Sequence, residues 1–160
     1  MRPAESSTRM ASDRAERLNQ MAQGFSETFD ITAGDYAAAG EASAKIKGLL
    51  KRIGIDPALV RRGTIAAYEA EMNIVIHSHG GQMTLSVTPE AVSLLCSDTG
   101  PGIENIDQAM QEGFSTAPSS VRLMGFGAGM GLPNMKRNSD TFDIRSGPAG
   151  TTLSMSFGMR

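Results

Sequence analysis

The sequence contains a single cysteine, Cys96, and no long run of apolar residues. One cysteine cannot form an internal disulfide or a conventional zinc site, and its apolar neighbours indicate an inert thiol in a buried strand. No stretch approaches the roughly 18 consecutive apolar residues of a membrane span, and the N-terminus lacks the apolar stretch of a signal peptide. We therefore expect a cytoplasmic protein that does not contact a membrane.

An excess of charge of one sign is also missing. The formal net charge is −2, and no cluster of Lys and Arg alternates with aromatic residues. The chain therefore has no general attraction for a phosphate backbone, and we expect no direct nucleic-acid partner. Its 160 residues, of which 40% are hydrophobic, suffice for one compact domain with a single site.

Polarity divides the chain into two parts. Residues 1–24 carry few large apolar groups, which predicts a flexible tail, and their composition favours a short helix over 11–21. Residues 25–160 show the apolar periodicities of a folded domain. In this domain we predict an edge strand at 25–31, helices at 35–52, 57–78 and 129–138, strands at 83–88, 91–97, 142–146 and 152–157, and a lid segment, a long loop over a ligand, at 100–126.

The order of these elements indicates the fold class. Asp56 can cap a helix whose first turn accommodates Pro57, and the alternation of Met83, Leu85 and Val87 with polar residues predicts a half-buried strand. Helices and hairpins follow one another in blocks, not in strict alternation. This order predicts an α+β fold, a two-layer α/β sandwich with a mostly antiparallel sheet and helices on one face.

Three groups of residues could carry chemistry, and the first lies on the predicted helix at 57–78. Glu69, Asn73 and His77 are four residues apart, so they form one polar stripe. An amide oxygen is a hard ligand suited to Mg²⁺, and a carboxylate one turn away could deprotonate an attacking hydroxyl. A solvated helix face explains the stripe equally well when the stripe is taken alone.

The second group follows the predicted strand at 91–97, where the chain must turn. Asp98 lies at the end of this strand and could accept a hydrogen bond from an exocyclic amine such as adenine N6. Gly100 and Gly102 have no Cβ, so the backbone could approach a flat base. Taken alone, an Asp followed by Gly-Pro-Gly is more simply an ordinary turn.

The third group is a glycine-rich segment, residues 125–133, which leads into the last predicted helix. The dinucleotide pattern fails because other residues occupy its third glycine position, and no Gly-Lys-Ser or Gly-Lys-Thr forms a P-loop. A flexible hinge before a helix is the less favoured explanation. Backbone N–H groups could instead cradle phosphates at the helix N-terminus; the glycines are Gly125, Gly127, Gly129 and Gly131.

Together, the order and spacing of the three groups resemble the N, G1 and G2 boxes of the GHKL (Bergerat-fold) superfamily over residues 29–157. Glu-Ala-Glu-Met-Asn resembles the N box, Asp-Thr-Gly-Pro-Gly-Ile the G1 box, and Gly-Phe-Gly-Ala-Gly-Met-Gly-Leu-Pro the G2 box. Gly-Thr-Thr at 150–152 is similar to the family's closing element. Residues 108–116, with the later Gly-Leu-Pro-Asn-Met-Lys-Arg, are most similar to anti-sigma-factor serine/threonine kinases and switch kinases.

This resemblance implies a role for each matched residue. Glu69 would act as the base toward a protein hydroxyl, and Asn73 would coordinate the Mg²⁺ that bridges the phosphates of ATP. Asp98 would bind adenine. The remaining members of the implied site are Gly100, Gly102 and Ile103 beside the base, Thr151 holding it, and Gly125, Gly127, Gly129 and Gly131 at the phosphates.

Other residues have weaker implied roles. His77 falls where relatives often have a basic group, and a place near the phosphates is as well supported as a role in capping the helix end. Arg122, in the lid segment, could contact a phosphate but is more simply a solvated arginine. Ser115 and Thr116 are expected to belong to the structure of the lid segment.

The resemblance implies a serine/threonine protein kinase that uses ATP and Mg²⁺ to phosphorylate a small regulatory protein similar to an anti-sigma-factor antagonist. A nucleotide-gated binding module, which sequesters a sigma factor or another regulator without phosphoryl transfer, is the alternative. A stand-alone ATPase is a third hypothesis. A homodimer is implied by the family alone.

Overall fold

The computed structural model describes residues 8–10, 12–13, 15–16, 19, 24–125, 127 and 129–159. In these residues five strands form a sheet with the order β1-β2-β3-β5-β4, and all neighbouring strands are antiparallel. β1 is an edge strand, as predicted. The strands are β1 (Phe25–Ile31), β2 (Gly81–Val87), β3 (Ala91–Asp98), β4 (Thr141–Gly147) and β5 (Gly150–Gly158).

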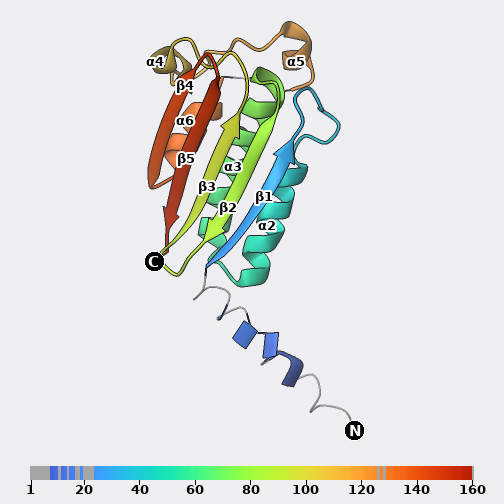
Figure 1. Ribbon diagram of the computed structural model, residues 1–160, viewed down its shortest axis with the longest axis vertical. Coiled ribbons are helices and arrows are strands. Elements are labelled where there is room, and N and C mark those ends of the chain that lie inside the picture. The colour runs from blue at the N-terminus through green and yellow to red at the C-terminus, as the bar shows by residue number, and fades with distance from the viewer. Residues whose placement is uncertain are drawn as a thin grey trace.

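Three helices cover one face of this sheet. Figure 1 shows α2 (Glu41–Ile53), α3 (Pro57–His77) and α6 (Gly131–Asn138) behind the strands, with α3 in the middle of the layer. The two short helices α4 (Ile106–Ala109) and α5 (Ser119–Leu123) lie at one end of the sheet. The predicted α+β class, a mainly antiparallel sheet with helices on one face, is confirmed.

The core lies between the sheet and the helical layer. Alternate residues of the three central strands point into it, and residues between them, such as Leu95 and Ser154, are exposed. Burying one large apolar side chain stabilises a fold by about 1.5–3 kcal/mol, so this alternation sets the strand register. The buried strand residues are Met83, Leu85, Val87, Val92, Leu94, Cys96, Leu153, Met155 and Phe157.

The start of α3 matches its prediction. The Asp56 carboxylate accepts hydrogen bonds from the backbone N–H groups of Ala58 at 3.0 Å and Leu59 at 3.4 Å, and Pro57 occupies the first turn. This cap satisfies donors that the helix itself leaves unpaired. It places the start of a 21-residue helix that ends at His77, one residue before the predicted end.

The prediction for the first helix was wrong at its N-terminus: α2 begins at Glu41, not at residue 35. Gly40 precedes the helix with a φ of +97°, and the buried Glu71 carboxylate of α3 accepts the backbone N–H of Gly40 at 2.8 Å, of Ala42 at 2.9 Å and of Ser43 at 3.2 Å. The cap therefore comes from a side chain about thirty residues later. Burial raises the pKa of the Glu71 carboxyl, although these three hydrogen bonds oppose the shift.

The lid segment and the start of the last helix also differ from prediction. The lid segment, expected to be a loop, contains α4 and α5, and the Asn105 side chain caps α4 by accepting the Gln108 N–H at 3.0 Å. The last helix begins at Gly131 and not at 129, because Gly129 has a φ of +79°, outside the helical region. Short capped turns have too little periodicity to be recognised from the sequence.

The remaining predictions concern the N-terminus, the cysteine and membranes. Most of the predicted tail lies outside the described residues; those described at 8–10, 12–13, 15–16 and 19 are helical. Cys96 is buried, as predicted, and burial, with a smaller effect of Asp98, raises the pKa of its thiol to about 12. In the described part of the chain, no helix is both long and apolar enough to cross a bilayer.

Candidate functional site

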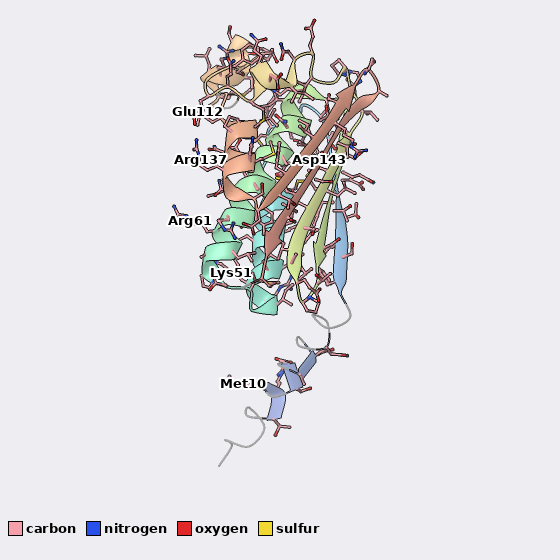
Figure 2. The ribbon with its side chains drawn as sticks, turned by 90° about the vertical axis from the view of Figure 1, so that its left-hand side faces the viewer. Met10, Lys51, Arg61, Glu112, Arg137 and Asp143 are labelled. Atoms are coloured by element: carbon pink, nitrogen blue, oxygen red, sulfur yellow. The ribbon has the colours of Figure 1, made fainter. Side chains whose placement is uncertain are left out.

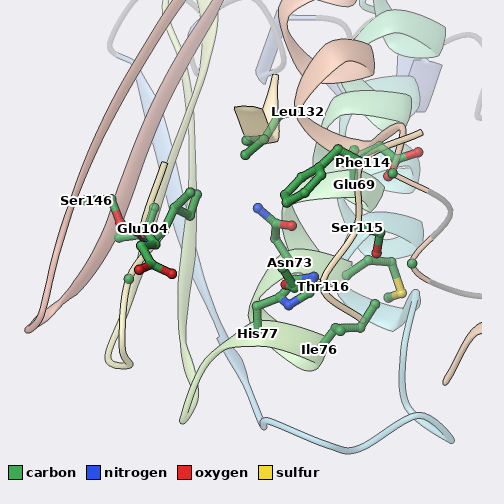
Figure 3. Close-up of a pocket in the computed structure, with 18 of the residues that line it drawn as sticks. Glu69, Asn73, Ile76, His77, Glu104, Phe114, Ser115, Thr116, Leu132 and Ser146 are labelled. Atoms are coloured by element: carbon green, nitrogen blue, oxygen red, sulfur yellow. Dashed lines mark hydrogen bonds between the residues drawn. The ribbon is translucent and has the colours of Figure 1, made fainter. Parts of the chain in front are cut away.

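A cavity of about 1200 Å³ opens where α3, the end of β3, the lid segment, the start of α6 and the β4–β5 turn meet. In Figure 3, Asn73 and His77 on α3 face Glu104 and Ser146 across it. Every predicted site residue except Gly100 lies in the cavity wall: Glu69, Asn73, His77, Asp98, Gly102, Ile103, Gly125, Gly127, Gly129, Gly131 and Thr151.

The polar stripe on α3 forms one side of the cavity. The start of α6 lies against it, since a Cβ added at Gly131 would be 3.3 Å from Glu69 Oε2 and 3.9 Å from Asn73 Oδ1. His77 ends the helix at the rim, where nearby protein atoms desolvate its ring and lower its pKa. A carboxylate and an amide oxygen therefore meet at the N-terminus of a second helix.

Asp98 forms the opposite side of the cavity, at the end of β3. Its Oδ1 accepts a hydrogen bond from the Thr151 backbone N–H at 3.1 Å. Burial raises the pKa of Asp98, while that hydrogen bond and the nearby His79 oppose the shift. Among the described residues none donates a hydrogen bond to Oδ2, so this oxygen can accept one from a ligand.

Glycines allow the β4–β5 turn to approach Asp98 closely. A Cβ at Gly150 would lie 2.0 Å from the Asp98 carbonyl oxygen, and one at Gly102 would lie 2.2 Å from the Gly147 carbonyl oxygen. Gly150 has a φ of +137° and Gly102 one of +77°. Glycine is therefore required at both positions for backbone packing.

Ile103 and Gly100, which follow Asp98, contact different parts of the structure. The Ile103 N–H donates to Ser146 Oγ at 2.6 Å, and Ser146 Oγ lies 2.7 Å from Thr151 Oγ1, so hydroxyls connect this segment to β4 and β5. Gly100 does not line the cavity. A Cβ there would be 3.1 Å from the Ser78 Cα, which shows that Gly100 packs against the end of α3.

The glycine-rich segment packs against the lid segment. The Gly113 N–H donates to the Gly129 carbonyl at 2.9 Å, and a Cβ at Gly129 would be 2.4 Å from the carbonyl carbon of Gly113. A Cβ at Gly127 would be 2.4 Å from the Ala117 Cβ. Phe126 and Ala128, within the same predicted segment, lie outside the described residues. The lid segment in this conformation therefore depends on glycine at 127 and 129.

Arg122 is not in the cavity wall. Its guanidinium donates to the Ser115 carbonyl at 2.5 Å, within the lid segment, whereas Ser115 and Thr116 line the cavity. A second link joins the lid segment to α6 through the ion pair of Glu112 with Arg137, both labelled in Figure 2. These contacts support the conformation of the lid segment.

The wall of the cavity is acidic. Three carboxylates line it, those of Glu69, Asp98 and Glu104, and none of the described wall residues is Lys or Arg. An anionic ligand would consequently depend on backbone N–H groups, the N-terminus of α6 and a bound cation.

Asn134, on α6, is a further residue at the site and was not predicted from the sequence. Its side-chain amide donates to Glu69 Oε1 at 3.2 Å, across 65 residues of sequence. The residue belongs to the Gly-Leu-Pro-Asn stretch, but the spacing of the three groups gives no signal that its side chain points toward Glu69. Ser146 and Glu104 were missed for the same reason, because only the folded chain brings them into the wall.

Two characterised proteins are similar to this chain in sequence. The serine/threonine-protein kinase RsbT of Bacillus subtilis is 29% identical over 120 residues, 72% of this chain and 82% of that protein. The anti-sigma F factor of Bacillus licheniformis is 37% identical over 92 residues, 53% of this chain; the chain spans 60% of that relative.

A solved structure gives the same fold. The SiaB-SiaC complex from Pseudomonas aeruginosa contains a chain that aligns with a TM-score of 0.53 at 12% identity, covering 96% of this chain and all of that one. The family model described as the histidine kinase-like ATPase domain matches residues 32–157, a span that contains all three boxes and the whole cavity wall. This chain therefore belongs to the histidine kinase-like ATPase (GHKL) family, and its relatives include one named a serine/threonine-protein kinase and one named an anti-sigma F factor.

Proposed function

We propose that this protein is a cytoplasmic ATP-dependent serine/threonine protein kinase that phosphorylates a small regulatory protein similar to an anti-sigma-factor antagonist. The supporting observation is that Glu69 and Asn73, one turn apart on α3, line the same cavity as Asp98 and the glycine-rich segment. The ATP-binding domain would span residues 25–160, with residues 1–24 as a flexible tail. Among the relatives, one is named a serine/threonine-protein kinase.

The proposed pose of ATP places adenine against Asp98 and the phosphates at the glycine-rich segment. Asp98 Oδ2 would accept a hydrogen bond from adenine N6, while Thr151 holds Asp98 Oδ1. The backbone N–H groups before α6 would contact the phosphate oxygens. Because the cavity wall has no lysine or arginine among its described residues, the negative charge of the triphosphate calls for a divalent cation.

The donor set fits a magnesium ion held mainly by phosphates. Among the described residues, no group of three or more His, Cys, Asp or Glu side chains could hold a metal ion. A magnesium ion would therefore need the phosphates of ATP among its ligands. Asn73 would contribute its amide oxygen, a hard donor suited to Mg²⁺, and bound Mg²⁺ supplies positive charge beside the phosphates. The protein would thus acquire the ion together with ATP.

The proposed reaction is a direct phosphoryl transfer. A serine or threonine Oγ of the partner forms a bond to the γ-phosphorus, the bond from that phosphorus to the β–γ bridging oxygen breaks, and ADP leaves. Glu69 accepts the hydroxyl proton. Positioning and charge stabilisation account for most of the catalysis in reactions of this kind.

A nucleotide-gated binding module is the second candidate. A relative named an anti-sigma F factor favours it, since this protein could likewise sequester a sigma factor or another regulator. That the protein forms a homodimer is a separate hypothesis, implied by the family alone. In the module, partner binding would change between ATP and ADP without any transfer of phosphate.

The test is incubation of the full chain with γ-labelled ATP, Mg²⁺ and candidate antagonist proteins. The kinase proposal expects label on a serine or threonine of one partner, located by mass spectrometry. A partner that binds in a nucleotide-dependent manner but acquires no label would favour the module, and phosphate release without any partner would favour an ATPase.

Asp98→Asn tests adenine recognition directly. An asparagine can keep its Oδ1 on the Thr151 N–H, but its Nδ2 would then point a donor at the adenine amine. We expect ATP to bind about 5- to 150-fold more weakly, which corresponds to roughly 1–3 kcal/mol, as measured by calorimetry. Because burial raises the pKa of Asp98, wild-type affinity should begin to fall on acidification at a higher pH than an ordinary aspartate would give.

The control for this change is Glu104→Gln, which removes a negative charge from the same wall. Its side chain is not at the end of β3, and less repulsion of the phosphates should leave affinity unchanged or higher. Unchanged ATP affinity in Asp98→Asn would exclude adenine recognition by Asp98.

A further inference from the structure

Asn134 on α6 makes a polar contact with the proposed base. Its Nδ2 lies 3.2 Å from Glu69 Oε1, and the two residues come from different helices. The neighbours of Asn134 on α6, Pro133 and Met135, are buried, so the helix is fixed in its rotation with the Asn134 side chain directed to α3.

The other carboxylate oxygen of Glu69 is directed to Gly131. A Cβ at that position would lie only 3.3 Å from Oε2, so the absence of a side chain leaves space beside this oxygen. Gly131 lines the cavity, as Glu69 does. One oxygen of Glu69 is therefore occupied by an amide and the other faces space that a reacting group could enter.

The direction of the hydrogen bond follows from the chemistry of the two groups. An ionised carboxylate only accepts hydrogen bonds, so the amide must present its NH₂ to Glu69. An amide at Oε1 restrains rotation of the carboxylate about its last bond. A third group that orients a base in this way is a recurrent feature of sites in which a hydroxyl is activated.

We propose that Asn134 is a positioning residue that holds the Glu69 carboxylate with Oε2 directed at the incoming hydroxyl of the partner. This inference rests on the proposed kinase function, and it adds a residue that acts through Glu69 without touching ATP or the partner. The alternative is that the amide only links α3 to α6 and contributes to stability.

Asn134→Ala in the full chain separates these two roles. We expect kcat for transfer to a phosphoacceptor partner to fall about 10- to 100-fold, because the carboxylate can then turn away from the hydroxyl, while KM for ATP stays within about twofold. In a Glu69→Gln background the same change should have little further effect, since residues that act as a unit are not additive.

The matched control is Asn138→Ala, one turn later on α6. The Asn138 side chain donates to the Asn134 carbonyl at 2.8 Å, so this change also removes an amide hydrogen bond from the helix but leaves Glu69 in contact with Asn134. We expect its kcat to match the wild type. Equal losses of kcat in both variants would indicate a stability effect and overturn the positioning role.

A readout without catalysis is the NMR signal of the Asn134 side-chain NH₂, identified by its loss in Asn134→Ala. The signal should shift in Glu69→Ala, which removes the acceptor, and should not shift in Glu90→Ala, which changes an exposed glutamate between β2 and β3. An unchanged signal in Glu69→Ala would exclude the hydrogen bond in solution.

The outcomes distinguish the two levels of the inference. If the wild type transfers phosphate and Asn134→Ala transfers it equally well, the positioning role is overturned. The kinase proposal then still stands. No transfer by the wild type to any partner, despite the expected NMR shift, overturns the kinase proposal and with it the role of Asn134 in catalysis.

Discussion

Glu69→Gln is expected to slow phosphoryl transfer by about 10²- to 10⁴-fold, the usual contribution of a positioned general base. Glutamine keeps an oxygen that can accept the Asn134 amide, so the geometry at α6 is retained while the ability to take a proton is lost. ATP affinity should stay within about twofold, because Asp98 and the glycine-rich segment are untouched. Single-turnover transfer of labelled phosphate, with ATP affinity from calorimetry, measures both quantities.

The control is Glu90→Gln, the same chemical change at an exposed position between β2 and β3. It should leave transfer and binding as in the wild type. Unimpaired transfer by Glu69→Gln would remove Glu69 as the base. Full control of a partner by Glu69→Ala, with no phosphate on that partner at any stage, would instead support the nucleotide-gated module.

Gly150→Ala is expected to lower the free energy of unfolding by about 3–5 kcal/mol. The new Cβ would lie 2.0 Å from the Asp98 carbonyl oxygen and 3.2 Å from the Thr99 Cα, and backbone atoms cannot move aside as a flexible side chain can. The residue would also be strained at a φ of +137°. A backbone shift that relieved this close contact would move the segment that carries Asp98. ATP affinity should therefore fall together with stability.

Gly147→Ala is the control in the same turn. No atom lies within 4 Å of a Cβ at Gly147, and Gly147 does not have a positive φ, so the free energy of unfolding should change by only about 0.5 kcal/mol. Urea unfolding of the two variants measures the difference. Equal stabilities would show that the close approach of the β4–β5 turn to β3 does not occur in solution.

Local patterns account for the elements that were predicted correctly. The Asp56-Pro57 cap lies next to the helix it starts, and the alternation in β2 and β5 lies within each strand. Such signals need no distant partner, so they can be recognised in the sequence. The start of α2 could not be recognised in this way, because the Glu71 carboxylate caps it from about thirty residues later. Nothing in the sequence distinguishes this buried glutamate from an exposed glutamate on a helix.

The candidate site likewise contains residues that local patterns identify and contacts that only the folded chain shows. The spacing of Glu69 and Asn73, the glycines before α6 and Asp98 at a strand end were sufficient to identify the boxes of the family, because each is a short-range pattern. Gly100 was assigned to the base, but it packs against Ser78, and only the folded chain could show this contact.

By itself, the sequence determined the class of fold and the residue types available for nucleotide chemistry, since both depend on periodicity and spacing along the chain. Tertiary structure alone decided which oxygen of Glu69 is held by Asn134 and why residue 150 must be glycine. The physical reason is that these contacts join segments more than fifty residues apart. Their distances depend on how helices and strands pack, and no local pattern records that packing.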